Sequence, residues 1–202
     1  QTWDYFKLWL NGRYFTDVQG HWAQEYILSS ALRGWMTGVS SSSFLPQKSL
    51  TRAETAAILV RALQSDAATA GNGGGGFSNI AAGIDFHDIQ GHWAEDEIRI
   101  AAQQGLVMGM GDGTFKPDTP VARQEMAVML DRALTSLPIK ESYPNTYSDV
   151  SRLRNSWSYD AILKMTDYGI FTGKPDGGFY PKAATTRAEM AVLMERAAEY
   201  IK

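Results

Sequence analysis

Three arginines stand at equivalent places in three similar strings, and their position suggests anion chemistry. Arg52 lies in "LTRAE", Arg123 in "VARQE" and Arg187 in "TTRAE", each just ahead of an apolar run with helical spacing. A cation in the first turn of a helix faces the positive end of the helix dipole, which mildly disfavours it. Free amides at a helix N-terminus, together with an arginine fork, are suited to hold a carboxylate or a phosphate. A solvated or salt-bridged surface arginine is the alternative.

The threonine and glutamate of these strings are explained by helix initiation. Thr51 with Glu54, and Thr186 with Glu189, have the spacing of a capping box, in which the hydroxyl accepts from the third helical amide and the carboxylate reaches back to the cap amide. In the second string the threonine is replaced by Ala122, and loss of the hydroxyl typically costs about 1 kcal/mol. We therefore expect that helix to be capped more weakly or to be held by packing.

The residue types give little support to metal binding or catalysis. The loops "GDGTFKP" (111–117) and "PDGGFYP" (175–181) hold one aspartate each, whereas a calcium loop needs several oxygen ligands, so turn chemistry explains them better and we expect no metal site. The chain has three histidines, His21, His87 and His92, and lacks a nucleophile elbow, zinc-ligand spacing and a phosphate loop. We interpret the two "GHWA" histidines as packing or capping groups. The prediction is a protein that is not an enzyme and has no cofactor.

The strings belong to a unit that occurs three times. Aligned on their tryptophans, the copies need no gap from the tryptophan to the last helix, and only the third copy is longer upstream, through the insertion "RLR" (152–154). A regular internal repeat indicates units that must pack together to share one core. The anchoring tryptophans are Trp22, Trp93 and Trp157, and the glycines at one equivalent place after them are Gly38, Gly109 and Gly173.

Each copy predicts a helix, a loop and a second helix, so the predicted fold class is mainly α. The first helix is expected to start at the tryptophan, with Trp22 on its buried face, and to end at a glycine such as Gly34, which suits the left-handed cap of a helix. The second helix starts at the arginine string and carries a wide apolar stripe. One pair of helices is too small to bury its own face, and three pairs side by side share a core.

Repeats and connectors divide the chain into six expected segments. They are an aromatic N-terminal helix that packs onto the repeats (1–14), repeat 1 (15–63), a glycine-rich flexible tether (64–85), repeat 2 (86–134), a shorter connector stiffened by two prolines (135–146) and repeat 3 (147–202).

Composition limits the partners. The net charge of -3 gives no reason to expect nucleic acid as a partner, and the absence of cysteine excludes disulfides and thiolate metal sites. No apolar run approaches the roughly 18 residues that span a bilayer, so we predict no membrane insertion. The first residue is not methionine, and we interpret the chain as a processed product or a fragment. The composition fits either the cytosol or the exterior of a bacterium.

The repeated set "FTDVQGHWA", "GWMTG", "FLP" and "LTRAE" closely resembles the S-layer homology (SLH) domain family, over roughly residues 14–198. The resemblance implies three tandem SLH repeats in a pseudo-threefold arrangement around a central three-helix bundle, with grooves between neighbouring repeats. It also implies an exported protein at the bacterial cell surface, anchored without covalent bonds to secondary cell wall polymer. In many members the ligand is a pyruvylated N-acetylmannosamine at the polymer end, whose ketal carries a carboxylate that would suit the arginines.

The resemblance further implies which residues bind the glycan. Arg52 and Arg187 stand in intact motifs and Arg123 in an altered one, so we expect the grooves that use the first two to bind more strongly. The other candidates are possible acceptors for sugar hydroxyls (Asp17, Asp88, Asp149), glycines that admit the sugar close to the backbone (Gly38, Gly109, Gly173) and tryptophans (Trp22, Trp93, Trp157). The tryptophans either present a ring face to the sugar or pack in the core, and the large area that tryptophan buries favours the core.

The rival function is a protein–protein interaction scaffold with no glycan ligand. An exposed apolar patch would favour the scaffold, whereas polar grooves lined by arginine would favour a sugar acid. The two functions are therefore separated by the kind of surface that lies between the repeats.

Overall fold

The computed structural model describes residues 14–69 and 85–201, and this part of the chain is mainly α, as predicted. The described residues pair as β-structure only in isolated bridges, and none of their helices is long and apolar enough to cross a bilayer. The elements are η1 (Thr16–Val18), α2 (Gln24–Leu32), α3 (Arg52–Thr69), α4 (Glu95–Gln103), α5 (Arg123–Ala133), α6 (Tyr159–Asp167) and α7 (Arg187–Ala197).

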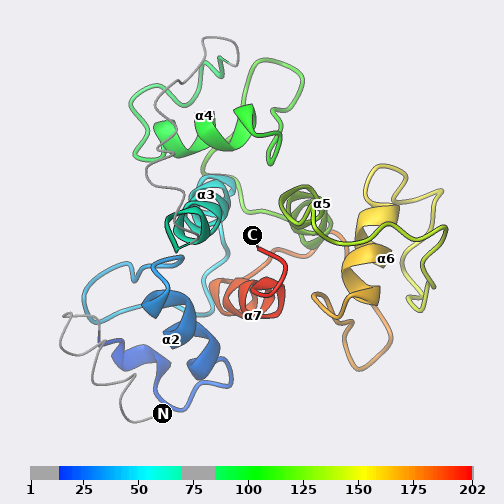
Figure 1. The fold of residues 1–202 in the computed structure, drawn as a ribbon, viewed down its shortest axis with the longest axis horizontal. Helices are drawn as coiled ribbons and strands as arrows, with labels where there is room; N and C mark the ends of the chain where they lie inside the picture. Colours follow the sequence, from blue (N-terminus) through cyan, green and yellow to red (C-terminus); the bar gives the residue numbers. More distant parts are fainter. Residues whose placement is uncertain (1–13, 70–84, 202) are drawn as a thin grey trace.

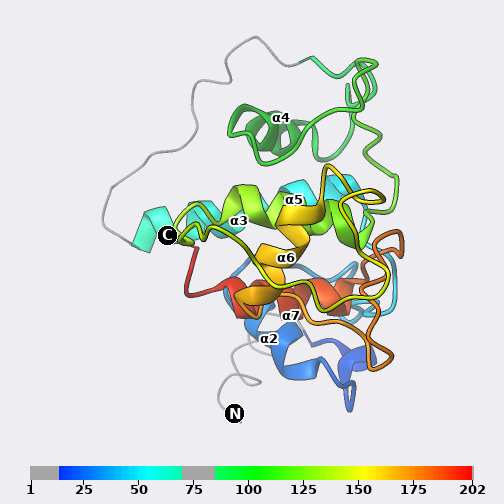
Figure 2. The same cartoon turned by 90° about the vertical axis from the view of Figure 1, so that its right-hand side faces the viewer.

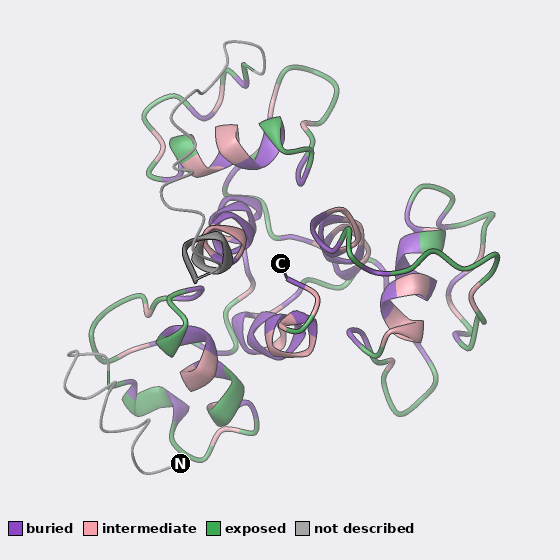
Figure 3. Ribbon diagram, in the orientation of Figure 1, coloured by how far each residue is buried: buried purple, intermediate pink, exposed green. Residues whose placement is uncertain are grey.

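The second helices of the three repeats, α3, α5 and α7, surround the centre of the molecule, and α2, α4 and α6 lie outside them (Figure 1). The central helices are seen end-on in Figure 1 and lengthwise in Figure 2, so they run side by side, with α4 and α6 lying across them. Buried residues concentrate on the central helices, whereas the outer loops are mostly exposed (Figure 3). The predicted apolar stripe is confirmed as core, since Ala57, Ile58, Val60, Ala62, Met126, Met129, Leu130, Met190, Leu193 and Met194 are all buried.

The outer helices start two residues later than predicted and end as predicted. α2 begins at Gln24, the fully buried Ala23 precedes it, and Trp22 stays in the turn before the helix. The same offset places the starts of α4 and α6 at Glu95 and Tyr159. At the other end, a left-handed backbone that glycine adopts without a Cβ clash is found at Gly34 (φ 74°), Gly105 (φ 72°) and Gly169 (φ 70°).

Helices pack closely across repeats, which corrects the expectation that the two helices of one repeat form a hairpin pair. Among the described helices, α3 of repeat 1 packs against α4 of repeat 2, and α5 of repeat 2 packs against α6 of repeat 3. α7 of repeat 3 packs against α2 of repeat 1. Because the third repeat returns to the first, the order of contacts is closed.

Three backbone hydrogen bonds close a ring just before the central helices. Leu50 N donates to Thr185 O (2.8 Å), Thr185 N to Val121 O (3.0 Å) and Val121 N to Leu50 O (2.9 Å). All three residues are fully buried, and each lies two positions before the arginine of its repeat. The ring therefore fixes where α3, α5 and α7 begin.

The connectors differ from the prediction at one boundary. α3 continues to Thr69, so the predicted tether 64–85 begins inside a helix. Residues 70–84 of that tether and residues 1–13 of the predicted N-terminal helix lie outside the described residues. The connector 135–146 packs on the body, because Leu137 is buried and the Ser136 hydroxyl donates to Tyr200 O (2.7 Å).

The ring contains a hydroxyl that has no partner, and this predicts a stabilising substitution. Thr185 Oγ1 is buried without a hydrogen bond, where repeats 1 and 2 have Leu50 and Val121. Thr185→Val keeps the shape and removes the desolvated hydroxyl, so we expect the free energy of unfolding in urea to rise by about 1 kcal/mol. The substitution Thr186→Val, at the adjacent residue, removes the hydroxyl that caps α7. It should lower the free energy of unfolding by about 1 kcal/mol. A loss of stability in Thr185→Val would show that its hydroxyl is bonded.

Candidate functional site

Arg187 of repeat 3 is buried and bonded into repeat 1. Arg187 is only 5% exposed. Nε donates to Phe44 O (2.8 Å), Nη2 to Thr37 O (2.5 Å) and Nη1 to Glu54 Oε1 (3.4 Å), with the guanidinium 4.4 Å from the centre of the Phe44 ring. Burial lowers the pKa of Arg187 and the Glu54 carboxylate opposes that shift; the guanidinium stays charged. All three of its nitrogens thus donate to the neighbouring repeat.

The other two arginines make the same bonds one step further around the molecule. Arg52 of repeat 1 reaches into repeat 2, Arg123 of repeat 2 reaches into repeat 3, and both are 4% exposed. The acceptors are Phe115 O, Met108 O and Glu125 for Arg52, and Phe179 O, Thr172 O and Glu189 for Arg123. The three arginines therefore form a closed series of contacts between repeats, which we call the arginine ring.

The amides at the starts of the central helices are occupied too. In α3, Arg52 N donates to Thr119 O (3.0 Å) and Ala53 N to Pro117 O (2.9 Å), both in the loop of repeat 2. These amides therefore bind protein rather than offering an open anion site of the kind expected from the sequence. The equivalent bonds are Arg123 N to Ala183 O, Gln124 N to Pro181 O, Arg187 N to Lys48 O and Ala188 N to Pro46 O.

Each capping glutamate serves both the helix and the ring. Glu54 Oε2 accepts from Thr51 N (2.9 Å) and the Thr51 hydroxyl accepts from Glu54 N (3.1 Å), while Oε1 receives Arg187. Thr186 and Glu189 make the same reciprocal pair at α7 (3.0 and 3.2 Å). One carboxylate therefore couples the start of a helix to the arginine of another repeat.

Helix α5 has only the glutamate half of the capping box. The arginine that meets this glutamate is not the one expected from the sequence. Glu125 Oε2 accepts from Ala122 N (2.8 Å), and the alanine side chain offers no acceptor in return. The arginine that meets Glu125 is Arg52, from the intact string of repeat 1. The altered string of repeat 2 therefore shares a groove with Arg52 rather than with Arg123, because each arginine reaches forward into the next repeat.

The three predicted aspartates hold the loop before the second helix. The Asp17 carboxylate accepts from Phe44 N (2.9 Å) and Leu45 N (2.8 Å), and Leu45 has a φ of 55°, which non-glycine residues rarely adopt. Burial raises the pKa of Asp17, but the bonds from Phe44 and Leu45 lower it by more, so the net shift is downward. Asp88 binds Phe115 N and Lys116 N, and Asp149 binds Phe179 N and Tyr180 N, in the same way. Their role toward a sugar stays a prediction.

The three predicted glycines are required by packing within their own repeats. A Cβ at Gly38 would lie 2.3 Å from the Phe15 ring and 2.5 Å from Ser40 O. Gly109 meets the Phe86 ring, and Gly173 the Tyr147 ring, in the same way (2.4 and 2.6 Å). The loop therefore needs glycine here whether or not a sugar approaches it.

The tryptophans lie outside the core, so the expectation that they pack in it is wrong. Trp22, Trp93 and Trp157 are 62%, 59% and 57% exposed. They precede the outer helices instead of starting them, and the small residue that follows each one is buried in their place. Trp22 and Trp93 each lie against the preceding histidine, with ring centres 5.5 Å apart.

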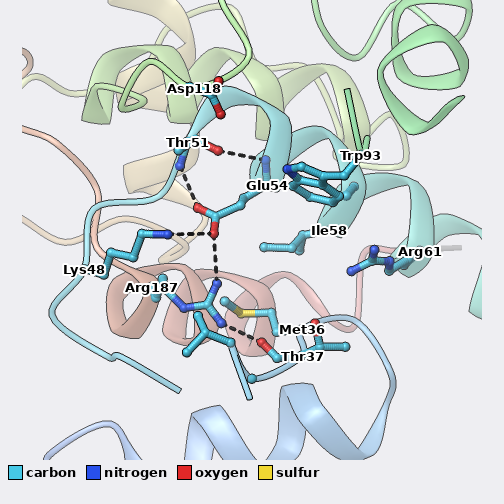
Figure 4. Close-up of a pocket in the computed structure, with 13 residues that line it drawn as sticks. Met36, Thr37, Lys48, Thr51, Glu54, Ile58, Arg61, Trp93, Asp118 and Arg187 are labelled. Carbon is cyan, nitrogen blue, oxygen red and sulfur yellow. Dashed lines mark hydrogen bonds and ion pairs between the residues drawn. The ribbon is translucent and has the colours of Figure 1, made fainter. Parts of the chain in front are cut away.

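A pocket of about 450 Å³ lies where the three repeats meet beside α3 (Figure 4). Arg187 of repeat 3 and Trp93 of repeat 2 line it together with the loop and helix of repeat 1. Hydrogen bonds and ion pairs join Thr51, Glu54, Lys48, Arg187 and Thr37 along one wall (Figure 4). The lining residues are Met36, Thr37, Gly38, Val39, Lys48, Thr51, Glu54, Ala57, Ile58, Arg61, Trp93, Asp118 and Arg187. We call this pocket groove 1.

Two cations in groove 1 were not predicted. Lys48 Nζ lies 3.4 Å from Glu54 Oε1 and has a half-exposed side chain, and Arg61 lies 3.4 Å from Glu97 with its side chain 32% exposed. Arg61 recurs as Arg132 and Arg196, each nine positions after the residue that its repeat contributes to the arginine ring. That recurrence is as regular as the one that singled out Arg52, so the signal was present in the sequence.

The lysine has an equivalent only in repeat 3, and it comes from another position. Lys174 Nζ reaches Glu189 Oε1 at 2.9 Å, although Lys174 aligns with Val39 rather than with Lys48. Repeat 2 has Met110 and Thr119 at these two positions. The grooves are therefore unequal in charge, and the difference does not follow the intact and altered arginine strings.

Comparison with known proteins gives a consistent result. The model of the S-layer homology domain matches residues 14–56, 85–127 and 146–191. The chain is 32% identical over 173 residues to "Cell surface glycoprotein 1" of Acetivibrio thermocellus (83% of this chain, 7% of that protein). It is 30% identical over 166 residues to the "Cellulosome-anchoring protein" of the same organism (82% and 35%), and 31% over 184 residues to an "Endoglucanase" of Bacillus sp. (89% and 18%). The chain thus spans a minor part of each of these relatives.

The arginine ring predicts a large loss of stability when one arginine is removed. Arg187→Ala leaves Thr37 O and Phe44 O without their donor and leaves Glu54 without its buried partner, so we expect the free energy of unfolding to fall by about 3 kcal/mol. Arg61→Ala, which removes a partly exposed arginine, should change it by less than about 0.5 kcal/mol. Urea unfolding followed by circular dichroism measures both; equal stability of the two variants would contradict the ring.

The aspartates predict instability in acid. Asp17 and Asp88 have pKa values below normal because the backbone amides that they accept from outweigh the effect of burial. Their stabilisation is therefore complete above the unfolded pKa of about 4 and is lost as the pH falls through the folded pKa. We expect unfolding free energy to be level between about pH 5 and 7 and to drop below about pH 4.

Asp17→Asn tests that account at neutral pH. It should lower the unfolding free energy by about 2 kcal/mol, since bonds to a charged acceptor are lost, and should flatten the drop in acid. Asp96→Asn, at an exposed carboxylate on α4, is the matched control. It should leave the unfolding free energy at neutral pH and its drop in acid nearly unchanged. The explanation fails if the two variants behave alike.

Proposed function

The chain belongs to the S-layer homology domain family, and we propose that it attaches its parent protein to the bacterial cell surface by binding secondary cell wall polymer without covalent bonds. The names of two relatives, a cell surface glycoprotein and a cellulosome-anchoring protein, support this location. A relative named an endoglucanase also shares the region. Since the match covers a minor part of each relative, we propose that the activity of such proteins lies elsewhere and that this region serves attachment.

Groove 1 is the observation that carries the proposal. Its volume of about 450 Å³ lies in the range of small-ligand pockets. Two accessible cations, Lys48 and Arg61, line it beside the exposed ring of Trp93. Cations that bind a carboxylate, with an aromatic face that packs against the apolar side of a sugar ring, are the features that an acidic sugar requires.

We propose that the ligand is the pyruvylated N-acetylmannosamine at the polymer end, held at its carboxylate by Lys48 and Arg61. Arg187 lines the same groove, but its three nitrogens already bind Thr37, Phe44 and Glu54. We assign to Arg187 the task of holding the Thr37 carbonyl and the Glu54 carboxylate in place as acceptors. Gly38 brings backbone to the wall without a side chain.

The rival scaffold function is less well supported. The wall of groove 1 is polar and charged along the line from Lys48 to Arg187, whereas a protein-docking face is expected to have an apolar centre. The most exposed apolar side chains among the described residues, Leu153 (95%) and Ile139 (89%), stand in the insertion of repeat 3 and in the connector before it. Scattered exposed side chains of this kind are normal on a soluble protein.

Binding of wall polymer before and after mild acid removal of the pyruvate ketal tests the ligand. We expect sedimentation of the protein with native polymer and little sedimentation with the treated polymer, because the treated end no longer carries the carboxylate. Equal binding to both preparations would rule out the carboxylate mechanism.

Variants of groove 1 test the residues. Lys48→Ala and Arg61→Ala should each weaken binding of the pyruvylated monosaccharide at this groove about tenfold, equivalent to about 1.4 kcal/mol, without loss of stability. Arg33→Ala removes an exposed arginine outside groove 1, paired at 3.9 Å with Glu195, and should bind like the unsubstituted protein. Titration calorimetry measures the affinity of each variant for the monosaccharide. Unchanged affinity in Lys48→Ala and Arg61→Ala refutes the assignment.

A further inference from the structure

Repeat 3 departs from the other repeats at two places, and both departures bring a cation to one pocket. Arg154 belongs to the insertion 152–154, which repeats 1 and 2 lack. Lys182 stands where repeat 1 has Gln47 and repeat 2 has Asp118. The two side chains line a pocket of about 480 Å³ together with Asp149, Asn155, Tyr180, Pro181 and Ala183. This pocket shares no residue with groove 1.

The pocket has an excess of positive charge. Within the described residues, neither Arg154 nor Lys182 has a carboxylate oxygen within ion-pair distance. Asp149 is the one acidic residue of the lining, and its two oxygens accept from Phe179 N (2.8 Å) and Tyr180 N (2.7 Å). The carboxylate is therefore committed to the loop, and the two cations remain available to a ligand.

The walls of the pocket are held in place and suit a sugar ring. The Tyr180 side chain is 44% exposed, its hydroxyl is bonded to the Asp176 carboxylate, and its amide is bonded to Asp149. Asn155 is 4% exposed and its amide group bonds Gln124 and the Ser151 amide. A fixed aromatic ring beside Pro181 offers an apolar face, with the two cations on the same lining.

We propose that this pocket binds a sugar that carries an anionic group, a carboxylate or a phosphate, as a second site separate from groove 1. The anionic group lies between Arg154 and Lys182, where an arginine fork and an ammonium both donate to it. The sugar ring packs on Tyr180. The site is particular to repeat 3, because repeats 1 and 2 lack both cations. The proposal goes beyond the attachment through groove 1 and does not depend on it.

Amide chemical shifts of the protein under titration test the site with defined probes. Glucuronic acid and glucose 6-phosphate present the two anionic groups on a sugar, glucose presents the ring alone, and inorganic phosphate presents the anion alone. We expect the two anionic sugars to shift the amides of residues 154, 180, 182 and 183 in a saturable way. We expect glucose and inorganic phosphate to bind at least fivefold more weakly than the anionic sugars.

Three variants identify the residues. Arg154→Ala and Lys182→Gln, the second restoring the residue of repeat 1, should each weaken binding of the preferred anionic sugar at least fivefold. Arg152→Ala is the matched control, since it removes a cation from the same insertion that is already paired with Asp160 at 2.9 Å. It should leave the affinity within twofold.

The outcomes separate this proposal from the one for groove 1. Lys48→Ala should not alter the amide shifts at residues 154, 180, 182 and 183, so a failure of groove 1 leaves this site intact. Equal binding of glucose and glucuronic acid would overturn the role of the anion. Phosphate that binds as well as glucose 6-phosphate would overturn the role of the sugar ring, and unchanged affinity in Arg154→Ala and Lys182→Gln would overturn the site itself.

Discussion

The structure depends on a charge that is expensive to bury and that one repeat cannot satisfy. A guanidinium removed from water destabilises the fold unless its donors are bonded. Arg52, Arg123 and Arg187 are each about 95% buried, and the acceptors of each lie in another repeat. A repeat on its own would leave its arginine either exposed to water or buried without acceptors. The three repeats therefore need one another for electrostatic reasons as well as to share a core.

This dependence is closed, which separates the molecule from an open stack of repeats. In a solenoid each repeat contacts its neighbours and the two ends are free. Here repeat 3 returns to repeat 1 through Arg187, through the bond from Leu50 N to Thr185 O, and through the packing of α7 on α2. The same closure builds groove 1, because the Glu54 carboxylate in its wall is held by an arginine of repeat 3. Stability and the proposed binding surface thus have a common origin.

Local patterns predicted the parts of this fold that depend on local chemistry. The three repeats, the glycines that end the outer helices, the apolar stripe of the central helices and the mainly α class follow from spacing and capping alone. The destination of the arginines did not, because the acceptors of Arg52 are more than 50 residues away and two of them are backbone carbonyls, which leave no mark in the sequence. The sequence left two interpretations of this arginine, an anion site and a solvated or salt-bridged surface residue, whereas loop carbonyls of the next repeat occupy that space.

The prediction that the tryptophans pack in the core was wrong for a related reason. Their size favours burial, but the position that is buried at the start of each outer helix is the small residue after the tryptophan, such as Ala23 and Ala94. The cations that line groove 1 show the opposite case. Arg61 recurs as regularly as Arg52, yet it was not predicted because it stands inside an apolar helix rather than in a recognisable motif.

The most direct test of the arginine ring is a double-mutant cycle between repeats 1 and 3. The unfolding free energy would be measured for Arg187→Met, for Glu54→Gln and for the double variant, alongside the unsubstituted protein. If the arginine joins the repeats through this carboxylate, the two changes are coupled by about 2 kcal/mol, as expected for residues in one buried network. Additivity to within about 0.5 kcal/mol would contradict the account, because Arg187 would then not be held by Glu54.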